Sequence, residues 1–144
     1  MRSQLAQSGL GDFAVLNVDT FTKPFWDAAR EHRLVIPQCD DCGTFHLPPS
    51  PVCYECDGES ISMIEVSGAG EVYSFTIVRH PVVPALVPVV PYVIAVVDLD
   101  GAPGARLVGN VIDCEPEAVR IGSKVTVVYD DIDDEVTIPR FVLA

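Results

Sequence analysis

Four cysteines in two closely spaced pairs are the residues of this 144-residue chain best suited to chemistry. The tetrapeptide CDDC begins at Cys39, the tetrapeptide CYEC begins at Cys53, and ten residues separate them. A C-x2-C pair presents two sulfurs from one tight turn, so two pairs can surround one ion tetrahedrally. The spacing therefore predicts a zinc site with four thiolate ligands: Cys39, Cys42, Cys53 and Cys56.

Four cysteine ligands would leave zinc no open coordination position, so we expect the metal to be structural rather than catalytic. The same four thiolates can bind iron, and sequence spacing does not distinguish the two ions. We favour zinc because nothing else in the sequence indicates electron transfer. Two disulfides are a further alternative, which a reducing cytoplasm opposes. We interpret the fifth cysteine, Cys114, as an ordinary small side chain.

The charge balance argues against some classes of partner. Asp and Glu outnumber Lys and Arg by 21 to 9, which gives a net charge of −12. Such a charge repels nucleic acid, because phosphate contacts dominate its binding to proteins. The first twelve residues lack the apolar segment and cleavage site of a secretory signal, which favours a cytoplasmic protein. Residues 81–97 carry no charge but contain four prolines, which would break a membrane-spanning helix.

Composition divides the chain into four segments. Residues 1–21 show no sustained hydrophobic periodicity, and we expect an extended arm there. Residues 22–33 are expected to form a short helix, because Thr22 can cap it and a proline suits its first turn. Residues 34–65 are rich in Cys, Pro, Gly and Asp and would form the zinc ribbon. Residues 66–144 would form a β domain.

Five runs rich in β-branched and aromatic residues predict the strands of that domain. The runs are Glu71 to Val78, Tyr92 to Leu99, Arg106 to Ile112, Lys124 to Tyr129 and Val136 to Val142. In the first run, alternation places Tyr73, Phe75 and Ile77 on one face of a half-buried strand. With a helical turn expected at residues 115–120, the pattern fits a five-stranded OB-fold barrel, although other small barrels satisfy it too. The predicted fold class is mainly β.

The sequence offers no evident catalytic set. His32, His46 and His80 lie beside no nucleophile in the sequence, and we find no nucleophile elbow, phosphate loop or dinucleotide fingerprint. The acidic run at residues 130–135 could bind a divalent cation. It fits a solvated hairpin turn between the last two strands better, because it lacks the glycine and the spacing of a calcium loop.

The segment from His80 to Pro91 contains more apolar side chains than a solvated loop needs. Four prolines stiffen it, so it could present these side chains to a partner or a hydrophobic ligand with little loss of entropy. The alternative is that the segment folds back onto its own barrel as core. The sequence supports both interpretations equally.

Several of these features occur together in one known family. They are Phe25-Trp26-Asp27-Ala28, Leu34, the C-x2-C-G motif at Cys39, Pro48-Pro49, Pro51-x-Cys53-x2-Cys56, G-x-VYSFT from Gly70, Pro91-Tyr92 and Ile121-Gly122. In order and spacing, the chain from residue 22 to its C-terminus resembles the domain of unknown function 35 (DUF35) family. The resemblance implies an N-terminal helix, a rubredoxin-like zinc ribbon and an OB fold.

The resemblance also implies a non-catalytic accessory subunit in acyl-CoA chemistry. Members of the family are similar to partners of thiolases and thiolase-like aldolases, including enzymes that cut steroid side chains, in which the thiolase-like subunit supplies the catalytic residues. The implied ligands are structural zinc and, for the complex, acyl-CoA, and the implied assembly is a heterotetramer or similar. Candidate contacts to the partner or to acyl-CoA are Phe25, Trp26, His80, Val82, Val83, Leu86 and Tyr92.

Two other functions stay open from the residues alone. A zinc ribbon and an OB fold can each bind single-stranded nucleic acid, although the net charge opposes it. An iron-containing redox carrier is the second alternative.

Overall fold

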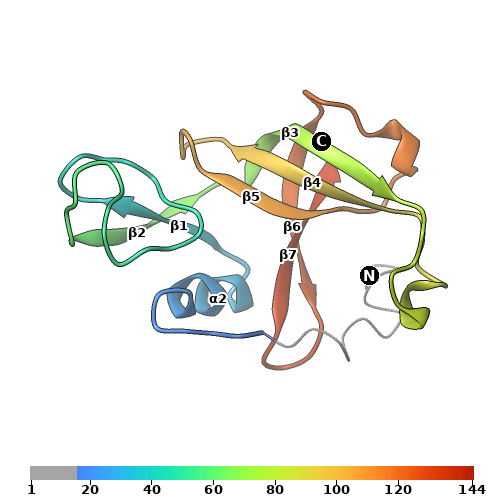
Figure 1. Cartoon of the computed structure of the whole chain (residues 1–144), viewed down its shortest axis with the longest axis horizontal. Helices are drawn as coiled ribbons and strands as arrows, with labels where there is room; N and C mark the ends of the chain where they lie inside the picture. The colour runs from blue at the N-terminus through green and yellow to red at the C-terminus, as the bar shows by residue number, and fades with distance from the viewer. Residues whose placement is uncertain (1–15) are drawn as a thin grey trace.

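The structure, a computed structural model, describes residues 16–144 (Figure 1). Its elements are α2 (Lys23–Arg30), the two-stranded sheet of β1 (Leu34–Cys39) and β2 (Ile61–Val66), and the barrel of β3 (Ala69–Val78), β4 (Tyr92–Leu99), β5 (Arg106–Val111), β6 (Lys124–Asp131) and β7 (Thr137–Leu143). The mainly β class with an N-terminal helix is confirmed. Most of the predicted arm, residues 1–15, lies outside the described residues. Within the described part, no helix has the length and apolar character needed to cross a membrane.

The barrel closes in the strand order β3-β4-β5-β7-β6. Neighbouring strands are antiparallel except β5 and β7, which meet in parallel at Val111 and Phe141. Short 3-10 helices lie in two of the connections, η2 (Pro84–Leu86) between β3 and β4 and η3 (Pro116–Ala118) between β5 and β6. The predicted five-stranded barrel, with a helical element after its third strand, is confirmed.

The helix α2 is shorter than predicted, and the Thr22 side chain does not cap it. Thr22 occupies the N-cap position, but its hydroxyl makes no capping hydrogen bond. Instead, Asp19 Oδ1 accepts hydrogen bonds from the backbone N–H groups of Phe21 and Thr22, at 2.9 and 2.7 Å. The turn before the helix therefore depends on an aspartate that we did not single out. The helix ends at Arg30 rather than near residue 33, and His32 follows with a left-handed φ of 56°.

A β-bulge in β3 overturns the predicted orientation of one aromatic residue. The register of β3 against β4 shifts at Tyr73. Phe75 and Ile77 pack against the core, whereas Tyr73 is half exposed and its ring lies 3.6 Å below the Arg106 guanidinium. The prediction that these three residues share one face was wrong, because a bulge inserts one residue and reverses the alternation beyond it.

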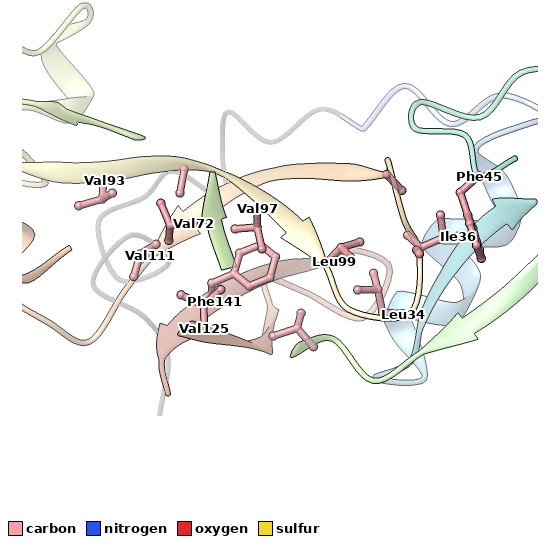
Figure 2. Packing of buried hydrophobic residues seen from close by; sticks show 14 of the residues in the cluster. Leu34, Ile36, Phe45, Val72, Val93, Val97, Leu99, Val111, Val125 and Phe141 are labelled. Carbon is pink, nitrogen blue, oxygen red and sulfur yellow. The ribbon is translucent and has the colours of Figure 1, made fainter. Parts of the chain in front are cut away.

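One hydrophobic core extends from the ribbon into the barrel (Figure 2). Leu34 and Ile36 of β1 belong to the same buried cluster as Val97 of β4 and Phe141 of β7. Figure 2 shows the Phe141 ring among the barrel side chains, with Leu34 and Ile36 further along the same cluster. Because α2 packs against both β1 and β7, it joins the ribbon to the barrel.

The barrel wall contains a buried ion pair that the sequence did not predict. Arg140 Nε donates to Asp130 Oδ2 at 2.6 Å, and both side chains are almost fully buried. A second nitrogen of Arg140 donates to Asn110 Oδ1 at 2.5 Å, and Asn110 Nδ2 donates to Val93 O at 3.0 Å. The predicted β6–β7 hairpin is present, but its first acidic residue lies inside the protein rather than in the solvated turn. Removing one partner of such a pair would leave a buried charge unpaired.

Two glycines allow a matched test of the packing between the ribbon and the barrel. Gly68 and Gly104 have φ of +79° and +83°, so alanine would be strained similarly at both positions. A Cβ at Gly68 would overlap the Val127 side chain, whereas one at Gly104 would meet nothing within 4 Å. We expect Gly68→Ala to lower the free energy of unfolding by about 1–3 kcal/mol more than Gly104→Ala, measured by urea denaturation. Equal losses would contradict this packing.

Candidate metal centre

The four cysteines lie on the hairpin that β1 and β2 form. Cys39, the last residue of β1, pairs with Ile61, the first residue of β2, and the loop between them carries the other three cysteines. In Figure 1 this ribbon lies at one end of the molecule, opposite the olive-green loop between β3 and β4.

Each cysteine pair lies in a tight turn that a left-handed residue closes. Gly43, directly after the first pair, has a φ of 77° and donates its N–H to Cys39 O at 2.9 Å. Asp57, directly after the second pair, has a φ of 59° and donates its N–H to Cys53 O at 2.9 Å. The two turns are therefore built alike. Aspartate can replace glycine in the second turn because its short polar side chain tolerates the left-handed region.

The four predicted ligand sulfurs come together, with every pair within 4.8 Å. Cys39 Sγ lies 3.6 Å from Cys56 Sγ, and Cys42 Sγ lies 3.5 Å from Cys53 Sγ. A disulfide needs about 2.05 Å between its sulfurs, so these pairs are not bonded. Four sulfurs placed about 2.3 Å from a central zinc ion would lie about 3.8 Å apart. The donor set therefore fits one tetrahedral ion and does not fit two disulfides.

Neighbouring groups affect the four thiols unequally. The hydroxyl and backbone N–H of Thr44 lower the pKa of Cys42 to about 6. The Gly58 backbone also lowers the pKa of Cys56, but the adjacent sulfurs of Cys42 and Cys39 outweigh it and raise the value to about 12. One thiol thus ionises easily and another resists, because like charges this close repel each other. A bound cation would remove that conflict and allow all four to be thiolates.

His46 lies inside the ribbon but is not one of the clustered ligands. Its side chain is 1% exposed, and the ring contacts Tyr54 edge-on with centroids 4.8 Å apart. Neither ring nitrogen has a hydrogen-bond partner among the described residues. The sequence placed this histidine in the ribbon but did not predict its burial.

The seven predicted contact residues do not form one surface. Phe25 and Trp26 lie on α2 beside the ribbon and line an apolar groove with residues of β5 and β7. The other five residues lie in or next to the loop between β3 and β4, which Figure 1 shows at the opposite end of the barrel. The two groups can therefore contact one ligand or partner only if it spans the molecule.

The apolar loop from His80 to Pro91 was expected either to contact a partner or ligand or to fold back onto the barrel as core, and each interpretation fits part of it. Leu86 and Val89 are buried and pack with Tyr92 and Ile112, so this part folds back onto the barrel. Val82 is 80% exposed, and Val83 and Val87 are exposed as well. The loop is thus partly core and partly an exposed apolar surface.

His32 forms a contact with an aspartate of the barrel. His32 Nε2 lies 3.0 Å from Asp131 Oδ1, and its ring stacks on Tyr129 with centroids 5.0 Å apart. The Thr137 hydroxyl, and after it His32, hold the pKa of Asp131 below its usual range. Both members of this His–Asp pair are about half exposed, and it joins the end of α2 to the barrel. We interpret it as a surface contact between elements.

Two family models match the chain. The rubredoxin-like zinc ribbon domain of ChsH2 matches residues 26–62, and the C-terminal OB-fold domain of ChsH2 matches residues 63–130. A DUF35 domain-containing scaffold protein of Methanocaldococcus jannaschii is 34% identical over 112 residues, which cover 76% of this chain and 77% of that protein. The chain belongs to the DUF35 family. The resemblance inferred from its motifs is thereby confirmed.

Other relatives of this DUF35 chain are much longer proteins. A probable enoyl-CoA hydratase alpha subunit of Thermomonospora curvata is 39% identical over 81% of this chain but only 36% of that protein. A 3-oxo-4,17-pregnadiene-20-carboxyl-CoA hydratase alpha subunit of Mycobacterium tuberculosis is 36% identical over 76% of this chain and 34% of that protein. The chain spans about a third of these relatives.

A solved structure shares the fold of this DUF35 chain over almost its whole length. The structure described as the Ltp2-ChsH2(DUF35) aldolase contains a chain with a TM-score of 0.80 and 33% identity. The match covers 90% of this chain and 98% of that chain.

Proposed function

We propose that this DUF35 chain is a non-catalytic accessory subunit of an enzyme that acts on acyl-CoA. The observation that carries the proposal is the cluster of four sulfurs. A metal ion with four thiolate ligands has no position for water or substrate, so it would organise the ribbon and leave the chemistry to another chain. We infer that the ion is zinc, held by Cys39, Cys42, Cys53 and Cys56.

The names of the relatives support a role in an enzyme complex. Two are called alpha subunits of CoA-ester hydratases, one is called a scaffold protein, and the solved structure is an aldolase named for two components. These names describe subunits, a scaffold and an assembly of two components. We propose the same division of labour for this chain, with acyl-CoA as a ligand of the complex.

The proposed partner is a thiolase-like catalytic subunit. The aldolase structure supports this choice, since its DUF35 chain matches the present one along its length. We propose a heterotetramer or a similar assembly, and degradation of a steroid side chain or another acyl-CoA as the reaction context. The nucleic-acid alternative has weaker support, because no Lys or Arg occurs between Arg33 and Arg79, which includes the whole ribbon.

Co-expression tests this proposal. We expect this chain to co-purify with a thiolase-like protein encoded beside it, and size-exclusion chromatography with light scattering should give one species of higher mass than either chain alone. The control is the Cys53→Ser variant, which should lose the complex because its ribbon cannot form. Separate elution of the two wild-type chains at micromolar concentration would contradict the proposed partner.

A further inference from the structure

An apolar groove lies where the helix, the ribbon and the barrel meet. It has a volume of about 270 Å³, and its lining includes Phe25 and Trp26 of α2, Leu47 and Pro48 of the ribbon, Val108 of β5 and Pro139 of β7. None of its lining residues carries an ionisable side chain. The lining comes from four separate segments of the sequence, so the groove exists only because the ribbon is docked on the barrel.

The groove is built from stiff parts. Phe25 and Trp26 pack edge-to-face, with ring centroids 5.0 Å apart and an interplanar angle of 90°. Phe25 is also buried in the main core, which fixes its position. Pro48, Pro49 and Pro139 add rings with no side-chain freedom to lose. A pre-formed apolar pocket of this kind binds an inserted side chain at low entropic cost, as at the centres of protein interfaces.

The Pro49 edge of the groove adjoins a carboxylate of the ribbon. Pro49 also lines a second cavity of about 270 Å³, whose lining includes Glu59. Asp40 Oδ2 accepts a hydrogen bond at 2.6 Å from the hydroxyl of Ser60, the residue that follows Glu59. The loop between β1 and β2 exposes five carboxylates, at residues 40, 41, 55, 57 and 59, and contains no Lys or Arg to balance them. Four thiolates around a divalent ion would add two further negative charges to the ribbon.

At the Trp26 edge of the groove the charges balance, since Trp26 also lines a cavity with Lys23, Arg30, Asp27 and Glu135. Each Lys and Arg side chain among residues 16–144 already has a carboxylate or backbone carbonyl partner. The ribbon therefore presents an uncompensated negative potential beside the groove. A partner surface that complements it must carry Lys or Arg around its apolar contact.

From these observations we propose that the groove receives a large apolar side chain of the catalytic subunit, flanked there by basic residues. The inference rests on the proposed function, because it takes the catalytic subunit as the occupant. An acyl-CoA is the competing occupant. Its phosphates would be repelled by the same carboxylates, so the charge favours a protein with a basic surface.

Val108 is the position that tests the groove. It lies in the lining and is 62% exposed, so a polar residue there should leave the fold intact. Lys and Glu are similar in length, and either would place a charge at the groove. If the flanking residues of the partner are basic, Val108→Lys adds repulsion whereas Val108→Glu adds attraction.

The experiment measures affinity for the co-expressed thiolase-like subunit by isothermal titration calorimetry. We expect Val108→Lys to weaken binding roughly thirtyfold, as for a central interface residue, and Val108→Glu to weaken it less than about tenfold. Ile121→Lys is the matched control, because Ile121 is 71% exposed and lies outside the groove. It should change affinity by less than about threefold. Val87→Lys, in the loop at the other end of the barrel, should behave like this control.

Each other outcome overturns the proposal in a distinguishable way. If the wild type binds but tolerates Val108→Lys, the groove is not the interface and the proposed function stands. If Val108→Lys and Val108→Glu weaken binding equally, the partner surface is not basic. If octanoyl-CoA binds the isolated chain and Val108→Lys abolishes that binding, the groove is a ligand site. If the wild type forms no complex, the proposed function fails and the groove proposal fails with it.

Discussion

A Cys53→Ser variant is expected to purify without zinc and with an unfolded ribbon, whereas the wild-type chain should contain about one zinc ion. Cys53 is fully buried, and its sulfur lies 3.5 Å from that of Cys42. Loss of one thiolate breaks a tetrahedral site whose metal contributes on the order of 10 kcal/mol to folding. Without the ion, the remaining contacts of residues 40–60 are too few to offset the entropy of ordering that loop. Elemental analysis by mass spectrometry and amide hydrogen exchange would measure both effects.

Cys114→Ser is the matched control for this result. Cys114 lies between β5 and η3, outside the sulfur cluster, and burial raises the pKa of its thiol. The control should keep its zinc and its ribbon protection. A zinc-free wild type with a protected ribbon would contradict the assignment. Visible absorbance from thiolate-bound iron in the purified protein would favour the redox alternative.

Phe141→Ala should lower the free energy of unfolding of the zinc-loaded chain by about 3–5 kcal/mol. Phe141 is completely buried and belongs to the core cluster that joins the barrel to the ribbon. The ring also fills the space beside Gly109, where a Cβ would lie 3.1 Å from Phe141 Cε2. Truncation would remove the transfer free energy of the ring and leave a cavity that the closed strands cannot collapse to fill. Urea denaturation followed by tryptophan fluorescence would measure the loss.

Phe21→Ala provides the comparison for the same chemical change at the surface. Phe21 is 48% exposed and precedes α2, so its truncation should cost less than about 1 kcal/mol. Similar losses for both variants would mean that the barrel core is not centred on Phe141.

The ribbon and the strands could be predicted because local sequence determines them. The two C-x2-C pairs carry their own turns, each closed by the left-handed residue that follows the pair, Gly43 or Asp57. Each barrel strand begins and ends within two residues of a predicted run, since β-branched and aromatic runs between turn residues are strong local signals. The order of motifs along the chain then identified the family.

The errors arose where tertiary contacts decide the local structure. Tyr73 faces solvent because of a bulge, which depends on how β3 pairs with its neighbours. Asp130 looked like part of a solvated acidic turn, and only the fold brings Arg140 beside it. The turn before α2 is held by Asp19, and the expected capping by Thr22 did not reveal it.

The arrangement of the candidate contact residues in space also depends on tertiary structure. The exposed apolar loop and the aromatic pair Phe25–Trp26 were both visible in the sequence as apolar segments. Their positions at opposite ends of the molecule were not, because strand order and closure place them there. The groove with Val108 could not be predicted at all, since it forms where four separate segments of the sequence converge.

Turnover of an acyl-CoA by the separated and combined chains tests the central claim most directly. The zinc-loaded chain alone, the thiolase-like subunit alone and their mixture would be assayed by release of free CoA or by product mass. The account predicts no turnover by this chain alone and a higher rate for the mixture than for the thiolase-like subunit alone. Sustained turnover by the isolated DUF35 chain would contradict it.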